Sequence, residues 1–420
     1  MRGEIVLSIL ALFGPCFCEE AKSFKGSRVV RTTPANQAQL QFLKDLEENV
    51  DLDLDFWTHP SHVRASVDIR VTSEEYPALA KLLNENGIVF TINIPDVQTL
   101  MDNENPLPAR SRRVGFVYSR YNRLGPIVQE LIKLVNEHRN LATLVTEFGK
   151  SYEGRTIHAV KISSNRNAGK KAFFINCGIH AREWITPATC MIMIREMLSK
   201  YGKDSSITAM IDKLDWVIMP VLNVDGYEFT HTGNRMWRKT RSRNSGSRCM
   251  GTDPNRNWNF AWAGAGTSSN PCRDTYHGPR PFSEVEVRNV ASYLYKNRRN
   301  IIGYMDIHAY SQLWMTPWGY KRAYPKEYSE LKRVSDIAVG ALYRLYGTKY
   351  RVGPSSIIIY ANSGSTKDWA YGVLGLKYAF ALELRDTGRY GFLLPANQIM
   401  PTGMETFAGI KAMAQALKLD

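Results

Sequence analysis

The sequence lacks the features that mark membrane proteins and cysteine-rich metal sites. After the first 20 residues no apolar run approaches the roughly 20 residues that a membrane-spanning helix needs, so no membrane span is expected. Six cysteines occur in 420 residues without any C-x-x-C spacing, which argues against a zinc site of four thiolates. Internal repeats, low-complexity segments and Asn-x-Ser/Thr sequons are also absent, so neither a repeat architecture nor N-glycosylation is expected.

The one marked apolar run lies at the N-terminus and is short. Residues 5–17 are mostly apolar and follow Arg2, and the small residues Cys16 and Cys18 precede two glutamates. A charged start, a short apolar stretch and a small-residue cleavage site are typical of a secretory signal peptide. We therefore expect residues 1–18 to be removed and the protein to be secreted and extracellular.

Four cysteines remain after removal of the signal peptide. An even number in an oxidising compartment indicates disulfides rather than free thiols. Sequence alone allows three pairings. Of these we choose the local one, which joins Cys177 to Cys190 and Cys249 to Cys272.

The length and the charge distribution both indicate two units. A chain of 420 residues exceeds the usual single domain. The net charge of +14 is uneven, because residues 1–113 carry −4 and residues 114–420 carry +18. An acidic front and a basic back suit intramolecular docking, and the basic part can attract acidic substrates or heparin-like polyanions. No nucleic-acid partner is expected.

The front part, residues 19–113, is predicted to be a small α+β domain. Its apolar periodicity predicts strands over 28–32, 53–58, 64–71 and 87–94, with helices over 36–48 and 74–84. This order is that of a ferredoxin-like split βαβ arrangement, and no catalytic pattern occurs in it. A polar linker then leads to the basic tetrapeptide 110–113, which ends at Arg113. An exposed basic run in a linker is a natural cleavage site, and Arg-Ser-Arg-Arg resembles the site of a proprotein convertase or trypsin-like protease.

The back part, residues 114–420, alternates strands and helices. Apolar runs predict strands over 156–162, 172–177, 215–220, 302–308 and 378–384, with helices over 184–200, 284–297, 327–346 and 405–417. This alternation predicts an α/β domain with a parallel or mixed sheet buried on both faces. In such sheets ligands bind at the carboxyl ends of the strands.

Two histidines fall at such strand ends. His180 and Glu183 follow the strand 172–177, and His308 ends the strand 302–308. Two histidines and one glutamate leave a fourth position open, as in a catalytic zinc site. A strand-end histidine is more often structural than a ligand, so this pattern alone is weak evidence.

Further residues strengthen the prediction of an active site. Asn255 and Arg256 offer an amide beside a guanidinium, a combination suited to binding a carboxylate. Glu383 ends an apolar strand, where burial raises the pKa of a carboxyl group toward that of a general base. Each residue could instead form a surface salt bridge or a helix cap, but their concentration in one domain favours catalysis.

Together these pieces resemble the secreted zinc procarboxypeptidases of the carboxypeptidase A/B family. The resemblance rests on His180-x-x-Glu183, Asn255-Arg256, His308-x-Tyr310, Tyr360 and the run Glu383-Leu384-Arg385-Asp386-Thr387-Gly388. It implies a catalytic domain over 114–420 with a mixed eight-stranded sheet flanked by helices. It also implies that residues 19–113 form an inhibitory activation segment, and the local cysteine pairs match the bridges of the B-like members.

The resemblance also implies a role for each matching residue. One Zn²⁺ is held by His180, Glu183 and His308, while Glu383 takes a proton from the zinc-activated water and later passes it to the leaving amine. Arg238 stabilises the oxyanion. Asn255, Arg256 and Tyr360 bind the substrate's terminal carboxylate, and Arg182 and Tyr310 line the approach to it. Asp253 orients a zinc histidine. A carboxylate clamp beside the metal predicts an exopeptidase acting on peptide or protein C-termini.

The expected specificity pocket departs from the common pattern. The family residue before the Asp368-Trp369 pair is apolar in A-type enzymes and aspartate in B-type enzymes, but here it is Lys367. An ammonium group there pairs with a C-terminal Glu or Asp side chain, as the basic residue of carboxypeptidase O does. Asn362 and Ser365 add polar character, while Met315 and Ala381 leave room. The alternative is that Lys367 extends out of the pocket and leaves an A-type chamber for apolar side chains.

A different class of function stays open at this point. A non-catalytic secreted protein on the same fold could use the basic cluster 238–248 to bind heparin-like polyanions. The intact zinc ligands and Glu383 argue against it.

Overall fold

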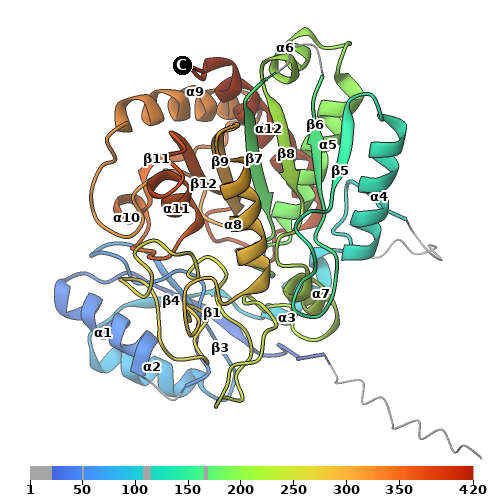
Figure 1. Ribbon diagram of the computed structural model, residues 1–420. Coiled ribbons are helices and arrows are strands. Elements are labelled where there is room, and N and C mark those ends of the chain that lie inside the picture. Colours follow the sequence, from blue (N-terminus) through green and yellow to red (C-terminus); the bar gives the residue numbers. More distant parts are fainter. Residues whose placement is uncertain (1–20, 50–51, 107–114, 165–168, 420) are drawn as a thin grey trace, which may run out of the picture.

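The computed structural model describes residues 21–49, 52–106, 115–164 and 169–419. The predicted signal peptide, residues 1–18, and the predicted cleavage site at Arg113 lie outside these described residues. Two sheets organise the chain, one of four strands in the front part and one of eight strands in the back part (Figure 1).

The front sheet has the ferredoxin-like order that the sequence predicts. It is antiparallel with the order β2-β3-β1-β4 and carries the helices α1 and α2. Its elements are β1 (Arg28–Thr32), α1 (Gln37–Asn49), β2 (Asp55–Phe56), β3 (Val67–Val71), α2 (Tyr76–Glu85) and β4 (Phe90–Ile94). A further helix, α3 (Val97–Glu104), was not predicted; Asp96 caps it by accepting a hydrogen bond from Thr99 N at 2.9 Å.

The back sheet is mixed, with the order β11-β10-β12-β9-β7-β8-β6-β5. Its central strands β12, β9, β7 and β8 are parallel, because each follows a helical or long connection. The outer strands β6, β5 and β10 pair antiparallel with their inner neighbours. The strands are β5 (Ala142–Val145), β6 (Ala159–Ile162), β7 (Ala172–Cys177), β8 (Asp215–Met219), β9 (Ile301–His308), β10 (Leu313–Thr316), β11 (Arg351–Pro354) and β12 (Tyr378–Glu383).

Helices cover both faces of this sheet. The helix α12 packs against α9 and α5, while α8 crosses the opposite face (Figure 1). The helices are α4 (Leu124–Glu137), α5 (Ile185–Lys200), α6 (Ser205–Lys213), α7 (Val224–Thr232), α8 (Val285–Asn297), α9 (Tyr328–Tyr346), α10 (Ser355–Ile358), α11 (Thr366–Gly372), η1 (Ala396–Gln398) and α12 (Ile399–Ala416).

Most differences from the sequence prediction are short elements, although the 14-residue amphipathic helix α4 was also missed. The helix α12 begins at Ile399 rather than at residue 405, because Pro401 lies in its first turn, where a missing N–H costs no hydrogen bond. Strands β5, β10 and β11 have only four residues each, too few to reveal a period. Helices α4, α6, α7, α10 and α11 were likewise not predicted.

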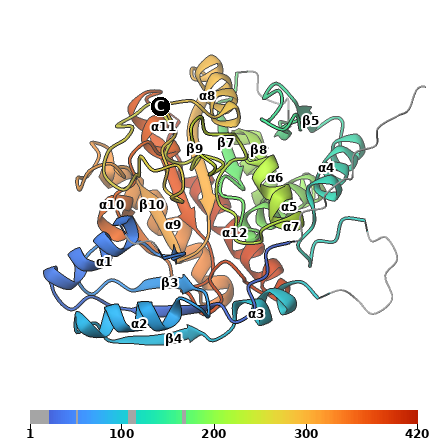
Figure 2. The same ribbon diagram turned by 90° about the horizontal axis from the view of Figure 1, so that it is seen from below.

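The front domain lies against the end of the large sheet where the parallel strands finish, as the two views agree (Figures 1 and 2). Val29, Trp57 and Ile94 of the front part belong to the same buried apolar cluster as the large domain's core, whereas Val30 and Ile69 belong to a separate inner cluster. The front domain therefore has its own core and also an apolar docking face. No helix among the described residues is long and apolar enough to cross a membrane.

Candidate active site

The three predicted zinc ligands meet at the carboxyl ends of β7 and β9. Glu183 Oε1 lies 2.7 Å from His180 Nδ1, and Glu183 Oε2 lies 3.2 Å from His308 Nδ1. The two Nδ1 atoms are themselves 3.2 Å apart. One donor atom from each residue lies within 4.8 Å of the others, and all three side chains are buried. Among the described residues this is the one group of three such side chains close enough to hold a metal ion.

Each histidine uses its second nitrogen to contact a carboxylate. His180 Nε2 lies 3.1 Å from Asp253 Oδ1, as predicted for Asp253, and His308 Nε2 lies 2.9 Å from Asp306 Oδ2. A carboxylate at Nε2 fixes the ring and leaves Nδ1 free to bind a metal. Two imidazole nitrogens and a carboxylate are the donors that suit a catalytic Zn²⁺ with an open position, so this donor set fits the metal.

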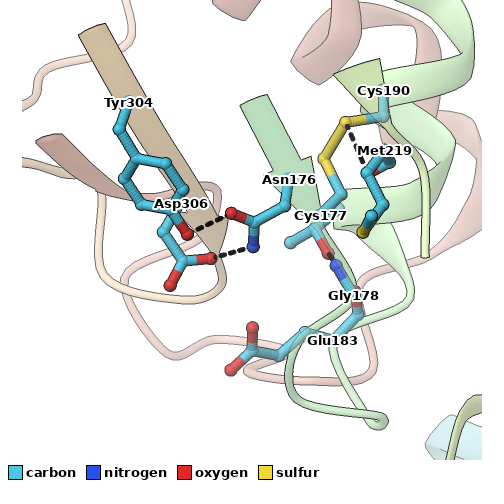
Figure 3. Close-up of a disulfide and its surroundings, with 9 residues drawn as sticks. Asn176, Cys177, Gly178, Glu183, Cys190, Met219, Tyr304 and Asp306 are labelled. Carbon is cyan, nitrogen blue, oxygen red and sulfur yellow. Dashed lines mark hydrogen bonds between the residues drawn. A yellow bond between two sulfur atoms is a disulfide. The ribbon is translucent and has the colours of Figure 1, made fainter. Parts of the chain in front are cut away.

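Asp306 is a site residue that sequence reasoning missed. Its Oδ1 accepts from Asn176 Nδ2 at 2.6 Å, and its Oδ2 accepts from Thr366 Oγ1 at 2.6 Å. Tyr304 donates in turn to Asn176 Oδ1 (Figure 3). Asp306 stands two residues before His308 and therefore on the same side of the strand, which is the signal that could have identified it.

The two disulfides follow the local pairing chosen from the sequence. Cys177 bonds to Cys190 and Cys249 bonds to Cys272. The first ties the end of β7 to α5, close to Glu183 and on the far side of Asn176 from Asp306 (Figure 3). It thereby fixes the turn between the strand that precedes His180 and the helix that follows Glu183.

The electrostatics of the ligand cluster favour charged carboxylates. Burial by itself raises the pKa of Glu183, but the two histidines outweigh it and hold that pKa well below its ordinary value. Burial likewise acts to raise the pKa of Asp253, and Arg238, Arg256 and His180 lower it well below the usual range. Both groups therefore stay ionised in the folded protein.

Glu383 and Arg238 lie in the same cavity as the zinc histidines. Glu383 ends β12 directly beside His308, its register partner on β9. Burial raises the pKa of Glu383 well above its ordinary value, and the nearby charge of His308 only partly opposes this. Arg238 Nη2 donates to Asp253 Oδ2 at 2.8 Å, so the guanidinium is held next to the metal ligands.

The three residues of the predicted carboxylate clamp, Asn255, Arg256 and Tyr360, lie in the cavity that Glu383 also lines. Asn255 is oriented by Thr366, whose main-chain N–H donates to Asn255 Oδ1 at 2.9 Å and whose Oγ1 lies 2.7 Å from the same oxygen. Arg256 is oriented by donating Nε to Gly266 O at 2.8 Å.

Gly364 allows the loop before α11 to approach the clamp. Its φ is +67°, and a Cβ there would lie 2.3 Å from the main-chain oxygen of Arg256. Only glycine tolerates both conditions. The close approach brings Ser365 and Lys367 to the cavity beside the clamp.

Beyond the clamp the cavity has one apolar and one polar wall. Met315 of β10 and Ala381 of β12 are register partners and form the apolar side together with Ile359. The polar side is formed by Ser355, Asn362, Ser365 and Lys367. The hydroxyls of Ser355 and Ser365 are buried and have no hydrogen-bond partner among the described residues. Ser355 was not predicted from sequence, because nothing in its local pattern marks it.

Lys367 is buried and lines this pocket rather than extending to solvent, since only 3% of its side chain is exposed. Its Nζ donates to Asp368 Oδ1 at 2.6 Å. Asp368 is held in turn by the main-chain N–H groups of Gly319 and Tyr320, at 2.7 and 2.9 Å. One of the three ammonium protons is thus accounted for by Asp368.

The front domain occupies the approach to this cavity. Arg182 donates to Asp55 of the front domain at 2.9 Å, and Tyr310 OH donates to Asp68 at 2.9 Å. His59 packs edge-on against the ring of Tyr360, with centroids 4.7 Å apart. Three residues with predicted substrate contacts are therefore covered.

A buried ion pair fixes the end of the front domain. Arg235 donates to both carboxylate oxygens of Glu104, with Nε to Oε2 at 2.9 Å, and stacks 3.7 Å from the ring of Trp184. The same guanidinium donates to the main-chain oxygens of Arg182 and Phe392 at 2.8 and 2.9 Å. The ion pair thus ties α3 to the turn that carries the zinc ligands.

Comparison with known proteins identifies both parts of the chain. Residues 127–409 match the family described as zinc carboxypeptidase, and residues 30–104 match the carboxypeptidase activation peptide. The chain belongs to the zinc carboxypeptidase family. Carboxypeptidase A2 of Mus musculus is 44% identical over 98% of both chains, and carboxypeptidase A1 of Homo sapiens is 44% identical over 98% of this chain and 97% of that protein. The crystal structure of thrombin activatable fibrinolysis inhibitor has a TM-score of 0.85 at 33% identity, covering 93% of this chain and 98% of that one.

The match covers the chain from the front domain to α12. The molecule is therefore a zinc metallocarboxypeptidase zymogen, with an activation peptide docked over a zinc site of His180, Glu183 and His308. The alternative of a non-catalytic polyanion-binding protein is not supported as its main function. The comparisons leave the acidic specificity predicted from Lys367 unsupported and favour the A-type alternative, since the mouse and human relatives are both carboxypeptidases A.

Proposed function

We propose that the activated enzyme is an exopeptidase that removes the last residue of peptides and proteins. The observation that carries this proposal is one cavity that is lined by the zinc histidines His180 and His308, by Glu383 and by the Asn255–Arg256–Tyr360 clamp. A terminal carboxylate bound at the clamp directs the last peptide bond toward the metal, whereas an internal bond has no charge to anchor it.

The catalytic roles follow from the positions of the side chains. A zinc ion held by His180, Glu183 and His308 would supply a Lewis acid that polarises the scissile carbonyl and activates water near neutral pH. Glu383 accepts the proton of the attacking water and delivers it to the nitrogen of the leaving residue. Arg238, held by Asp253, stabilises the negative charge that develops on the carbonyl oxygen.

We also propose how the protein matures. The bounds are a signal peptide over 1–18, an activation segment with its cleavable linker over 19–113 and a catalytic domain over 114–420. The basic run before Val114 and the apolar N-terminal run support secretion and then cleavage after Arg113 by a proprotein convertase or a trypsin-like protease. N-terminal sequencing of the protein secreted by convertase-competent cells tests both cuts; a product that keeps residues 19–113 argues against the convertase.

For the side chain that is removed, we propose a preference for Glu and Asp. The polar wall supports it: Lys367 has protons beyond the one given to Asp368, and the hydroxyls of Ser355 and Ser365 have no partner among the described residues. A carboxylate in the pocket accepts hydrogen bonds from these groups, whereas an apolar side chain leaves them buried and unpaired.

A second candidate is an A-type preference for apolar side chains. The mouse and human relatives and the wall of Met315, Ile359 and Ala381 support it. The ion pair of Lys367 with Asp368 also supports it, because Asp368 already compensates the charge of the ammonium.

A panel of peptides that differ only in the C-terminal residue separates the two candidates. We expect kcat/KM for Glu to exceed that for Phe by about tenfold or more, because the site's polar groups are paired only by the acidic side chain. Lys367→Met should reverse the order, while Lys326→Met, which changes an exposed lysine outside the pocket, should not. If the wild-type enzyme cleaves Phe as fast as Glu, or if Lys367→Met leaves the order unchanged, the acidic preference is wrong. Hydrolysis of peptides with an amidated C-terminus at the normal rate would contradict the exopeptidase itself.

A further inference from the structure

Basic side chains precede each of the central parallel strands at the end of the sheet remote from the zinc site. Lys171 stands before β7, Lys213 before β8, Arg299 before β9 and Lys377 before β12. These strands are consecutive in the sheet, in the order β12-β9-β7-β8. Because neighbouring strands lie about 4.8 Å apart, the four residues form a row roughly 15 Å long, which we call the rear edge.

The charges of the rear edge are not compensated by carboxylates. Within the part of the chain that the structure describes, no carboxylate oxygen lies within 4.0 Å of the charged nitrogens of these four residues. Lys171 Nζ donates instead to the main-chain oxygen of Arg299 at 2.7 Å, and Lys213 Nζ donates to the main-chain oxygen of Leu417 at 2.8 Å. Both contacts fix the positions of the lysine side chains, but the neutral carbonyl oxygens do not compensate their positive charges. The row therefore attracts anions.

A groove lies directly beside the rear edge. Its volume is about 570 Å³, and its described lining includes Lys161, Lys170, Tyr293, Asn297 and Asn300. Lys161 and Lys170 share the single carboxylate of Asp215, at 2.9 and 3.2 Å, so this trio keeps one net positive charge; Lys161 is its exposed cation, because the side chain of Lys170 is only 5% exposed.

A smaller cavity extends the groove toward β5. It has a volume of about 120 Å³, includes Arg139 and Asn140, and shares Lys161 and Ser163 with the larger groove. Together the two cavities therefore offer cations, amide and hydroxyl groups and one tyrosine ring.

We propose that the rear edge and this groove bind a sulfated polysaccharide chain. Sulfate groups pair with the cations, sugar hydroxyls hydrogen-bond to the asparagine amides, and a sugar ring packs on Tyr293. A single-stranded nucleic acid fits less well, because a row of stacked bases needs several aromatic side chains and the described lining offers one.

The position of this surface separates it from catalysis and from activation. The activation domain covers the opposite end of the sheet, at the bottom of Figure 1, whereas the rear edge lies at the top near α6 and the C-terminus. Zymogen and activated enzyme therefore bind the polysaccharide with the same affinity, and binding leaves hydrolysis of short peptides unchanged.

Immobilised heparin tests the proposal with the full-length zymogen and with the activated enzyme. Lys171→Glu, Arg299→Glu and Lys377→Glu together should raise the Kd about tenfold or more at physiological ionic strength and flatten its dependence on salt. The matched control changes three exposed arginines outside the rear edge, Arg243→Glu, Arg248→Glu and Arg322→Glu, and alters the net charge equally. It should change the Kd by less than about threefold, since long-range charge contributes little at this ionic strength.

Several results would overturn the proposal. They are unchanged binding by the rear-edge variant, an equal loss in the control variant, a change of affinity on activation, or equally tight binding of desulfated heparin or of a DNA oligonucleotide. Unaltered hydrolysis of a short peptide by the rear-edge variant verifies that it is folded, so a loss of binding cannot be attributed to unfolding.

Discussion

The zinc centre and the side-chain pocket share one cavity but differ in how their buried polar atoms are paired. In the zinc centre His180, Glu183 and His308 contact one another, and each histidine also contacts a carboxylate. In the pocket the hydroxyls of Ser355 and Ser365 have no partner among the described residues. In the first region these polar side chains are paired with one another, whereas in the second two buried hydroxyl groups are left without a partner in the described part of the chain.

This difference separates the part of the cavity that holds the zinc ligands from the part that we propose selects the substrate side chain. A buried polar atom without a partner costs about 1–3 kcal/mol, so it persists where a ligand supplies the missing bond or where the cost is tolerated. The paired side chains of the zinc centre predict the type of reaction. The unpaired hydroxyl groups of the pocket predict the type of substrate side chain.

The largest expected effect comes from replacing Glu383, the proposed general base beside the zinc ligands. Glu383→Gln keeps the size of the side chain but cannot accept the proton of the attacking water. We expect kcat/KM to fall by about 10³-fold or more, toward the upper end of the range for general-base catalysis. Hydrolysis of a C-terminal peptide series by the activated variant measures it.

Zinc content and substrate affinity serve as controls for that variant. Metal analysis should still find one zinc per chain, because Glu383 is not a member of the donor group of His180, Glu183 and His308. Loss of zinc from the Glu383→Gln variant, or retention of more than about a tenth of the activity, would contradict the assignment of Glu383 as the base.

Sequence predicted the zinc centre better than the pocket for a physical reason. His180 and Glu183 are neighbours in the chain, and His308 and Glu383 mark strand ends, so local patterns reveal them. Asp306 is hidden inside an apolar strand, and its role depends on contacts with Asn176 and Thr366 that only the fold creates.

The same reasoning applies to the polar wall and to the secondary structure. Lys367 could be singled out in the sequence as an unusual residue. Its burial beside Asp368 and the unpaired hydroxyl of Ser355 depend on how the segments around the pocket pack, which the sequence does not reveal. Most long strands and helices were predicted closely, although the 14-residue helix α4 was missed. Four-residue strands such as β10 and β11 were not predicted, although β10 carries Met315 of the pocket.

Glu286 tests whether every unpaired buried polar atom signals a ligand. It lies on α8, its Oε1 accepts from Tyr152 N at 2.8 Å, and its Oε2 has no partner among the described residues. Burial raises the pKa of Glu286 to about 7. It does not line the cavity of the zinc centre, so we expect it to affect stability and not specificity.

The raised pKa of Glu286 determines whether the stability of the folded protein rises or falls with pH. Between the ordinary value near 4.5 and the folded value of about 7, the folded state keeps the proton that the unfolded state has lost. The stabilising contribution therefore declines as pH rises through this window, by up to roughly 3 kcal/mol. Glu286→Gln should remove this decline in stability. The Tm of the variant should therefore rise relative to that of the wild type between pH 5 and pH 8.

Thermal unfolding of the zymogen at a series of pH values measures this difference. The matched control is Glu85→Gln, an exposed glutamate of α2, whose Tm should follow that of the wild type at each pH. Parallel pH profiles for wild type and Glu286→Gln would show that Glu286 is not protonated in the folded state, and altered preference for the C-terminal residue would show that it acts on the pocket.

The smallest and most selective effect is expected at Ser365. Ser365→Ala removes a buried hydroxyl that makes no hydrogen bond in the described structure, so the free energy of unfolding should stay equal or rise slightly. If that hydroxyl pairs with an acidic substrate, kcat/KM for C-terminal Glu should fall about threefold to tenfold while that for Phe does not fall. The control is Ser335→Ala, whose buried hydroxyl donates to Leu331 O at 2.7 Å and which should lose stability without a change in specificity. A Ser365→Ala enzyme that is less stable and equally active on Glu and Phe would show that the hydroxyl has a structural partner. The contrast between the zinc centre and the pocket would then depend on Lys367 and Ser355 alone.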